Sequence, residues 1–296
     1  MSDAADSHDP AGGDADPESA AGSDPDSAGS TSTSTPPSTS ATTTAGGRTD
    51  AETVLEVADL RKEFDGVVAL DGADVAVREG EIVTLIGPNG AGKTTLFDCV
   101  MGTLDPTSGR VTLRGEAITG LNTSDIVKRG LSRTFQIPRV FPELTVRENM
   151  VANQNHHGES LFRTLYSTTD PETDARIDDL LSFVGIEDKG DEPAGDLSTG
   201  QQKLLNLATT LLRDPDVIML DEPTAGVNPA LIDDITDKIL QLNAEGRTFL
   251  VIEHNMDVVR KITDYVYVLD SGTNLVDGQP GPTLSDDRVL EAYFGE

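Results

Sequence analysis

The nonapeptide Gly87-Pro-Asn-Gly-Ala-Gly-Lys-Thr-Thr95 lies between two apolar segments of different character. The preceding segment, Ile82-Val-Thr-Leu-Ile86, predicts a buried strand, and the segment that starts at Leu96 predicts a helix. The glycines of the nonapeptide let the backbone turn tightly, so that successive N–H groups can point at phosphate oxygens. Strand, glycine-rich turn and helix together predict a phosphate-binding loop rather than a plain glycine turn beside a surface lysine.

Two side chains of this loop carry the polar chemistry that a nucleotide needs. Lys93 offers a compact cation for the β- and γ-phosphates, and the hydroxyl of Thr94 is suited to Mg²⁺. The positive end of the following helix dipole adds to the field at the phosphates. The expected nucleotide-binding residues of the loop are Gly87, Pro88, Asn89, Gly90, Ala91, Gly92, Lys93, Thr94 and Thr95.

The whole chain is strongly acidic. It has 296 residues, enough for one large domain or two small ones, and a formal net charge of −30. This balance argues against a nucleic-acid partner bound through a basic face and against docking on anionic lipid by charge. Self-repelling acidic surfaces are typical of proteins from a salt-rich cytoplasm, so we expect a halophilic protein; an acidic protein of an ordinary cytoplasm is the alternative.

Residues 1–52 form an Asp-, Ser- and Thr-rich segment. Its first 50 residues contain no Leu, Ile, Val or Phe, so they cannot bury enough apolar surface to order themselves. The segment is therefore predicted to be a disordered tail. It lacks the cationic and then apolar pattern of a secretion signal, and no apolar run of about 18 residues predicts a membrane span elsewhere.

The pattern changes at Thr53. Short strands are predicted over residues 54–57, 67–77 and 110–114, with turns between them, and they are expected to form an antiparallel group. Phe64 precedes Lys93 by some two dozen residues. Its ring is placed to stack on adenine or to pack in the core at a strand edge, and position alone leaves both interpretations open.

The middle of the chain predicts helices. Thr145 and Glu148 form a capping box that opens a helix through about Val151, and a second helix is predicted from Asp174 to Val184. Between the strands and these helices, apolar residues crowd into a loop that includes Phe141. They are expected either to pack within the helical segment or to form a docking patch for an apolar partner helix.

A further helix begins in the stretch Leu197-Ser-Thr-Gly-Gln201. Ser198 and Gln201 fit the N-cap and N3 positions of a capping box. A capped helix start with small residues is also a place where an anion can bind. Taken alone, the pattern favours a plain capped helix.

Acidic and imidazole side chains follow two of the later apolar segments. The predicted strand 217–220 leads into Asp221 and Glu222, and the predicted strand 249–252 leads into Glu253 and His254. A carboxylate at the end of a buried strand beside a phosphate-binding loop is the expected Mg²⁺ partner, and its neighbour Glu222 is a candidate to polarise an attacking water. Strands alternating with helices predict an α/β fold with a parallel sheet.

These pieces, in this order, resemble the ATP-binding subunits of ABC transporters over residues 53–296. The corresponding motifs are Walker A at 87–95, the Q-loop at Gln136, the signature motif at 197–201, Walker B at 217–222 and the switch histidine at His254. The resemblance implies a P-loop NTPase core with a mainly parallel sheet, an antiparallel β subdomain, and a helical signature-motif subdomain that includes residues 137–197.

The same resemblance implies roles for the motif residues. Thr94, Gln136 and Asp221 would hold Mg²⁺ with ATP as substrate, while Glu222 and His254 would act in catalysis and Gln136 would also contact ATP. Two subunits of this family meet head to tail, so the signature residues would bind the partner's ATP in trans; these are Ser198, Thr199, Gly200 and Gln201. Thr199 departs from the usual glycine of the signature motif.

Finer features are similar to the branched-chain amino-acid uptake branch of the family. They are the stretches 133–136, 141–146, 222–229 and 253–256, and the ending Leu290-Glu-Ala-Tyr-Phe-Gly295. This similarity implies an importer for branched-chain or other hydrophobic amino acids, with the chain at the cytoplasmic membrane face. Its partners would be a second ATPase subunit, identical or paralogous, two transmembrane permease subunits and an extracellular substrate-binding protein. ATPases of lipid export and of soluble cluster assembly are the alternatives.

Overall fold

The structure, a computed structural model, describes residues 51–134, 140–154 and 170–294. All of them belong to one compact unit that spans residues 45–296. Nearly all of the predicted acidic tail and the predicted Q-loop residue Gln136 lie outside the described residues, so their assignments stay predictions.

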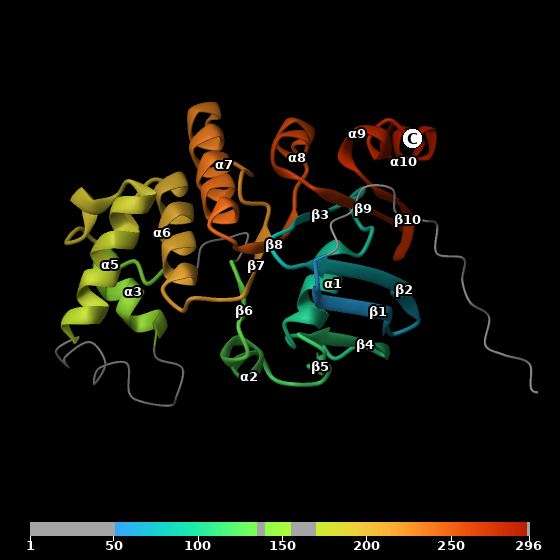
Figure 1. The fold of residues 1–296 in the computed structure, drawn as a ribbon, viewed down its shortest axis with the longest axis horizontal. Helices are drawn as coiled ribbons and strands as arrows, with labels where there is room; N and C mark the ends of the chain where they lie inside the picture. Colours follow the sequence, from blue (N-terminus) through green and yellow to red (C-terminus); the bar gives the residue numbers. More distant parts are fainter. Residues whose placement is uncertain (1–50, 135–139, 155–169, 295–296) are drawn as a thin grey trace, which may run out of the picture. The chain divides into compact units, whose positions relative to one another are not determined.

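The described elements follow one another as strands first and alternating strands and helices later (Figure 1). In chain order they are β1 (Thr53–Phe64), β2 (Val67–Arg78), β3 (Ile82–Ile86), α1 (Lys93–Val100), β4 (Ser108–Leu113), β5 (Glu116–Ala117), α2 (Thr123–Lys128), β6 (Leu131–Arg133), α3 (Val146–Gln154), α5 (Pro171–Val184), α6 (Thr199–Leu211), β7 (Val217–Asp221), α7 (Pro229–Ala244), β8 (Thr248–Ile252), α8 (Met256–Ile262), β9 (Tyr265–Asp270), β10 (Thr273–Gly278), α9 (Pro280–Thr283) and α10 (Asp287–Phe294).

The first strands form an antiparallel sheet, as predicted. Its order is β2-β1-β4-β5, and β1 pairs with β2 from Thr53 opposite Arg78 to Phe64 opposite Val67. The two-residue turn that joins them is Asp65-Gly66, and both residues have positive φ. Positive φ at both residues of a two-residue turn matches the twist of the flanking strands. This requirement explains why Asp and Gly, which tolerate positive φ, occupy the turn.

The second sheet is the predicted mainly parallel sheet. Its order is β10-β9-β3-β8-β7-β6; neighbours from β9 to β6 run parallel, and β10 is antiparallel to β9. Every residue of β3, β7 and β8 is buried, which explains why each of these strands is apolar at all but one position. The α/β P-loop architecture with a separate antiparallel sheet is thereby confirmed.

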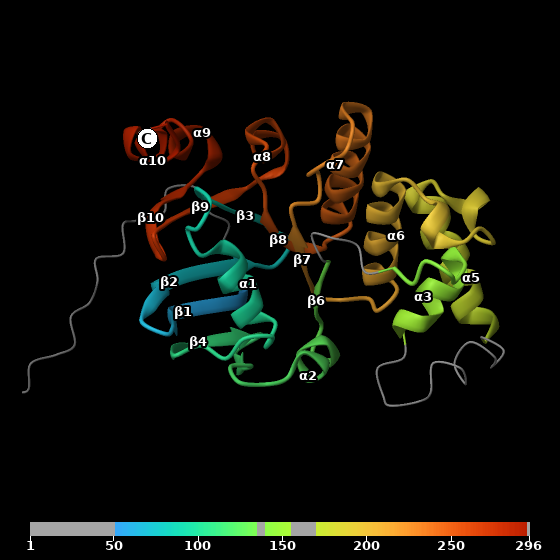
Figure 2. The same ribbon diagram turned by 180° about the vertical axis from the view of Figure 1, so that it is seen from behind.

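Alternate side chains of the central strands enter two different cores. Val217 and Met219 of β7 pack with α1 and the antiparallel sheet, whereas Ile218 and Leu220 pack with α5, α6 and α7. Figures 1 and 2 show α3, α5 and α6 gathered beside α7 at the β6 end of the sheet, away from α9 and α10. The helices that carry the signature stretch are thus fixed to one face of the sheet.

Helix starts agree with the local capping signals, and helix lengths agree less well. The Thr145 and Glu148 capping box is present, but α3 continues three residues beyond the predicted Val151. Helix α5 starts at Pro171 rather than Asp174, because Asp170 caps it by accepting from the backbone N–H groups of Glu172 and Thr173. Across the described ranges, no helix combines the length and the apolar character needed to cross a membrane.

Candidate nucleotide-binding site

The phosphate-binding loop leaves β3 and enters α1 at Lys93. Gly92, the N-cap of α1, has a left-handed φ of 101°. A Cβ on Gly92 would lie 2.6 Å from the carbonyl oxygen of Ala69 on β2, so the loop passes too close to the hairpin for any larger residue. The predicted order of strand, loop and helix is confirmed, and glycine is required where the loop turns into the helix.

Lys93 lies inside the loop. Its ammonium donates hydrogen bonds to the carbonyl oxygens of Gly87 and Pro88 at 2.7 and 2.9 Å. Burial lowers the pKa of Lys93, and the negative charges of Glu222 and Asp221 partly oppose that shift. The lysine is therefore held by two carbonyl groups of the loop, within electrostatic reach of the two carboxylates at the end of β7.

The ends of β7 and β8 bring the predicted acids and histidine together. Asp221 pairs with Ile252, so Glu222 and Glu253 leave neighbouring strands side by side. The Nε2 atom of His254 lies 3.1 Å from Oε1 of Glu222. Glu222 has a left-handed φ of 48° at this point, and its backbone N–H donates to the carbonyl oxygen of Ile252 at 2.9 Å.

A cavity of about 190 Å³ opens between the loop and these side chains. It is lined by Ala69, Asn89, Gly90, Ala91, Gly92, Lys93, Thr94, Thr95, Glu222 and His254. The structure thus brings together most of the predicted Walker A residues and both predicted catalytic side chains. Gly87 and Pro88 do not line the cavity, but their carbonyl oxygens accept the hydrogen bonds of Lys93.

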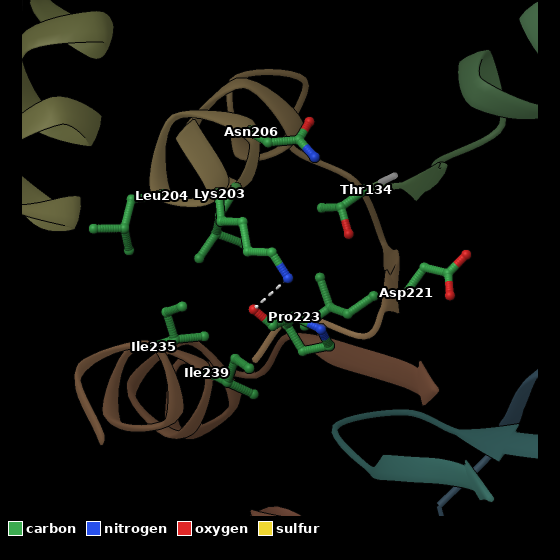
Figure 3. A pocket seen from close by; sticks show the side chains of 10 residues that line it. Thr134, Lys203, Leu204, Asn206, Asp221, Pro223, Ile235 and Ile239 are labelled. Carbon is green, nitrogen blue, oxygen red and sulfur yellow. Dashed lines mark hydrogen bonds between the residues drawn. The ribbon is translucent and has the colours of Figure 1, made fainter. Parts of the chain in front are cut away.

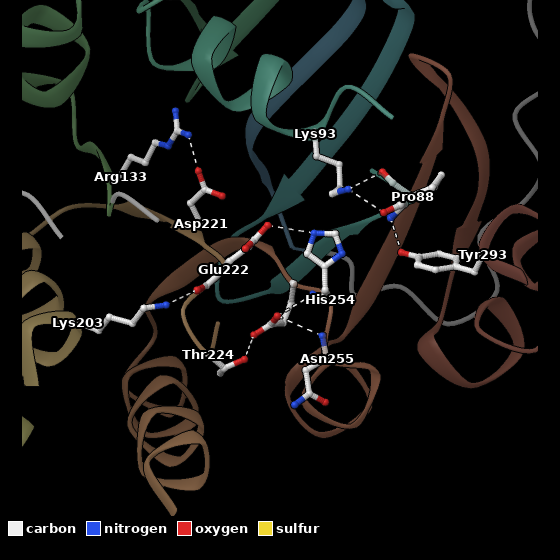
Figure 4. A network of polar contacts seen from close by, with 12 residues as sticks. Pro88, Lys93, Arg133, Lys203, Asp221, Glu222, Thr224, His254, Asn255 and Tyr293 are labelled. Carbon is white, nitrogen blue, oxygen red and sulfur yellow. Dashed lines mark hydrogen bonds and ion pairs between the residues drawn. The ribbon is translucent and has the colours of Figure 1, made fainter. Parts of the chain in front are cut away.

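Asp221 is almost fully buried, at 4% exposed, and forms an ion pair with Arg133, which the sequence analysis did not predict. Arg133, at the end of β6, donates to Asp221 at 2.5 Å (Figure 4). It also donates to Asp98 of α1 at 2.6 Å. Arg133 also lies over the ring of Phe97, with its guanidinium carbon 5.3 Å from the ring centroid. It therefore joins α1, β6 and β7.

Two of the predicted ligands, Thr94 and Asp221, offer oxygen atoms of the kind that Mg²⁺ prefers, although only Thr94 lines the cavity around Lys93. The hydroxyl of Thr94 and the carboxylate of Asp221 are hard oxygen ligands, and Mg²⁺ is usually held by one or two such side chains together with substrate phosphates. The described part of the chain contains no group of three His, Cys, Asp or Glu side chains that could hold a metal ion. The third predicted ligand, Gln136, lies outside the described residues.

The signature residues stand apart from the cavity. Ser198 caps α6 and forms the predicted capping box with Gln201, and both Ser198 and Thr199 are exposed. Gly200 is buried, and a Cβ there would lie 1.9 Å from the side chain of Leu231 of α7. None of the four signature residues lines the cavity around Lys93, so in a single chain they do not meet the loop.

Phe64 ends β1 with its ring 40% exposed, so it is not a core residue. Lys62 places its ammonium 4.8 Å from the ring centroid. Phe64 does not line the cavity around Lys93, and its stacking on adenine stays a prediction.

Glu253, Tyr293 and Lys203 also support the site, through contacts that the sequence analysis did not predict (Figure 4). Buried Glu253 accepts from the hydroxyl of Thr224 and from the backbone N–H of His254. The hydroxyl of Tyr293 accepts from the backbone N–H of Gly87, and Lys203 donates to the carbonyl oxygen of Glu222. Glu253 was findable as the neighbour of the predicted histidine, but the partners of Lys203 and Tyr293 lie far away in the sequence.

Comparisons with known proteins agree with this geometry. The ABC transporter family profile matches residues 70–225. The chain is 38% identical to the high-affinity branched-chain amino acid transport ATP-binding protein BraF of Pseudomonas aeruginosa, over 82% of this chain and 98% of that protein. It is 36% identical to the probable branched-chain amino acid transport ATP-binding protein LivG of Methanocaldococcus jannaschii, over 83% and 99%. Its fold matches the ADP conformation of an ATP-binding cassette of an ABC transporter, with a TM-score of 0.76 and 36% identity, over 83% of this chain and 100% of that one.

Proposed function

Since the chain belongs to the ABC transporter family of ATP-binding proteins, we propose that it hydrolyses ATP to drive an importer of branched-chain or other hydrophobic amino acids. The observation that carries the cargo assignment is the 38% identity to a branched-chain amino acid transport protein over nearly the whole of that relative. The relatives from Methanocaldococcus jannaschii and Salmonella typhimurium carry the same transport assignment in their names.

ATP would bind in the cavity between the loop and the ends of β7 and β8. Lys93 and the loop amides would hold the phosphates, and Phe64 would face the adenine. Thr94, Asp221 and Gln136 would hold Mg²⁺, which when bound neutralises developing charge on the phosphates. The short distance between Glu222 and His254 supports their joint placement at the γ-phosphate.

Glu222 is our candidate to polarise the attacking water. Its carboxylate lines the cavity opposite Lys93, and its contact with His254 Nε2 orients one of its oxygens. His254 would in turn contact the γ-phosphate. Hydrolysis in such a site depends on positioning and electrostatics, so the arrangement of these two side chains decides the rate.

A second subunit would complete the site. Ser198, Thr199 and Gln201 lie at the start of α6 and away from the cavity of their own chain, which supports a role toward the ATP of a partner. Gly200 would serve by letting α6 pack closely on α7 as well as by approaching that ATP. ATP then favours the closed pair because it contacts both chains, and hydrolysis removes that difference in contact.

The chain would sit at the cytoplasmic membrane face through two permease subunits, with an extracellular protein that delivers the amino acid. The test is ATP-driven uptake of labelled leucine into membrane vesicles that carry the complete transporter. Vesicles with Glu222→Gln should bind ATP and take up leucine roughly 10²–10³-fold more slowly, as expected for the loss of one positioned polar group. Rapid hydrolysis in Glu222→Gln would remove Glu222 from the chemistry, and ATP-driven lipid export without leucine uptake would contradict the cargo.

A further inference from the structure

Lys203 of the signature helix reaches the peptide that follows the candidate catalytic acid. Its ammonium donates to the carbonyl oxygen of Glu222 at 2.8 Å and to that of Pro223 at 3.3 Å. Figure 4 shows the first of these contacts, and Figure 3 shows the lysine extending from α6 toward Pro223. One side chain thus holds two successive carbonyl groups at the turn that leaves β7.

The backbone at this turn needs such support. Glu222 has a φ of 48°, in the left-handed region that residues other than glycine rarely adopt, and it precedes a proline. Conformations of this kind persist only where the surroundings hold them. The N–H of Glu222 is fixed by the carbonyl oxygen of Ile252, and its carbonyl oxygen is fixed by Lys203, so the residue is held on both sides.

The setting of Lys203 makes the contact strong. A small cavity of about 30 Å³ beside it is lined by apolar side chains of α6 and α7, among them Leu204, Ile235 and Ile239, together with polar ones such as Thr134 and Asp221 (Figure 3). Burial lowers the pKa of Lys203, while the charges of Glu253, Glu222 and Asp221 oppose that shift. Because Lys203 is partly buried, fewer water molecules compete for the carbonyl oxygens than at the surface, and a hydrogen bond to them is correspondingly favourable.

We propose that Lys203 is a positioning residue that fixes the Glu222–Pro223 turn, so that the Glu222 carboxylate points into the nucleotide cavity. The inference rests on the proposed function of Glu222. Because Lys203 lies on the same helix as Ser198, it also links the signature end of α6 to the catalytic turn within one chain. A displacement of α6 would therefore shift the backbone of Glu222 through this hydrogen bond.

The test replaces Lys203 by Met, which keeps the length of the side chain and removes the donor. Turnover of ATP by the purified chain should fall about 10–100-fold, as expected when a reacting group is misplaced by a fraction of an ångström or more, while KM and the affinity for ATP stay within about twofold. Lys203→Arg, which keeps the charge and the donors, should recover most of the turnover.

Lys238→Met is the matched control. Lys238 of α7 likewise donates to a backbone carbonyl oxygen, that of Phe183 at 2.7 Å, but it lies away from the nucleotide cavity. Its loss should lower the melting temperature without changing turnover. An equal drop in turnover for Lys238→Met would show that loss of stability, and not the turn, explains the effect.

The double variant Lys203→Met with Glu222→Gln distinguishes the positioning role of Lys203 from the proposed role of Glu222. If Lys203 acts through Glu222, adding Lys203→Met to Glu222→Gln should slow hydrolysis by less than about twofold more. Normal turnover in Lys203→Met, or a full further loss in the double variant, would overturn the positioning role while leaving Glu222 in place. Normal turnover in Glu222→Gln would instead remove Glu222 from the chemistry and, with it, the premise of this inference. Should Lys203→Met melt below the assay temperature, Lys203→Gln, which keeps a neutral donor, serves in the same comparison.

Discussion

The hydroxyl of Tyr293 in α10 accepts a hydrogen bond from the backbone N–H of Gly87, the first residue of the phosphate-binding loop, at 2.6 Å. The two residues are 206 positions apart. The end of the chain therefore supports the start of the loop directly, and the loop is held at this point by a side chain as well as by its own turn.

Tyr293→Phe should loosen the loop. The N–H of Gly87 would lose its acceptor, which we expect to cost about 1 kcal/mol of stability and to weaken ATP binding several-fold. Tyr267→Phe is the control, because the hydroxyl of Tyr267 also accepts from a backbone N–H, that of Ala76 at 3.2 Å, at a distance from the loop. It should cost similar stability and leave ATP affinity unchanged. Binding of a fluorescent ATP analogue together with urea unfolding would distinguish the two variants.

The same tyrosine predicts a pH dependence. Burial raises the pKa of Tyr293 to about 12 from its ordinary value near 10. A group whose folded pKa is raised contributes stability that is present below the unfolded pKa and is lost as pH rises to the folded pKa. The difference in unfolding free energy between wild type and Tyr293→Phe should thus be constant up to about pH 10 and shrink toward pH 12. A difference that grew over this range would contradict the burial of the phenol.

Arg133→Met should be among the most destabilising substitutions in the sheet. The side chain of Arg133 is 6% exposed and balances the buried carboxylate of Asp221, so its removal leaves an unpaired buried charge. We expect a loss of about 3–5 kcal/mol in urea unfolding. Arg114→Met removes the exposed pair with Asp216 and should cost no more than about 1 kcal/mol. Equal losses in the two variants would show that the burial of the Arg133 pair has no energetic consequence.

The loop, the strands and the helix caps were predictable because their signals are local. Residues 82–86 are apolar except for Thr84, since β3 is buried on both faces, and Ser198 and Gln201 form a capping box from neighbouring positions. The order of motifs then gave the fold class through the family resemblance. Helix α8 was missed because its seven residues are too few to show a helical period.

The supports of the site were not predictable. Arg133 is 88 positions from Asp221, and the partners of Tyr293 and Lys203 are set by how the sheets and helices pack. Gly200 shows the same limit, since its local pattern predicted a capped helix start where an anion could bind, whereas its lack of a side chain also lets α6 approach Leu231 of α7. Contacts of this kind depend on the tertiary structure and leave no periodic pattern in the sequence.

Lys93→Ala and Ser198→Arg should separate the two halves of the ATP site. Lys93 lies inside the loop, so its loss should weaken ATP binding by the single chain. Ser198 is exposed at the start of α6 and does not line the cavity of its own chain, so arginine there should spare this binding and prevent ATP-induced dimerisation. The measurements are nucleotide affinity at low protein concentration and light scattering with ATP. Equal loss of single-chain affinity in both variants would contradict the arrangement in trans.

Stability should rise with salt if the acidic surface belongs to a halophilic protein. The formal net charge is −30, and the screening length falls from about 30 Å at 0.01 M salt to about 3 Å at 1 M. Mutual repulsion of the acidic groups is therefore long-ranged only in dilute buffer. We expect the melting temperature to increase steeply between these concentrations with KCl, and full stability in dilute buffer would reject the halophilic interpretation.

The loop before α3 presents an exposed aromatic side chain on a rigid support. Asn149 is 1% exposed, and its amide donates to the carbonyl oxygens of Phe141, Leu144 and Thr145 while its oxygen accepts from the N–H of Phe141. The ring of Phe141 is nevertheless 43% exposed. Packing within the helical segment thus accounts for the backbone of the loop and leaves the ring available to a partner.

Phe141→Asp should consequently separate membrane coupling from ATP chemistry. Because the backbone of the loop is held by Asn149, the melting temperature and the ATPase activity of the purified chain should stay close to those of wild type. Membrane association and ATP-driven leucine uptake should be lost, since aromatic anchors dominate the energetics of interfaces. Leu290→Asp on α10 is the control, because Leu290 is similarly exposed, at 42%, and lies on a helix remote from this loop. Unchanged uptake in Phe141→Asp would dismiss the docking patch, and a collapse of its melting temperature would show that the ring stabilises the chain itself.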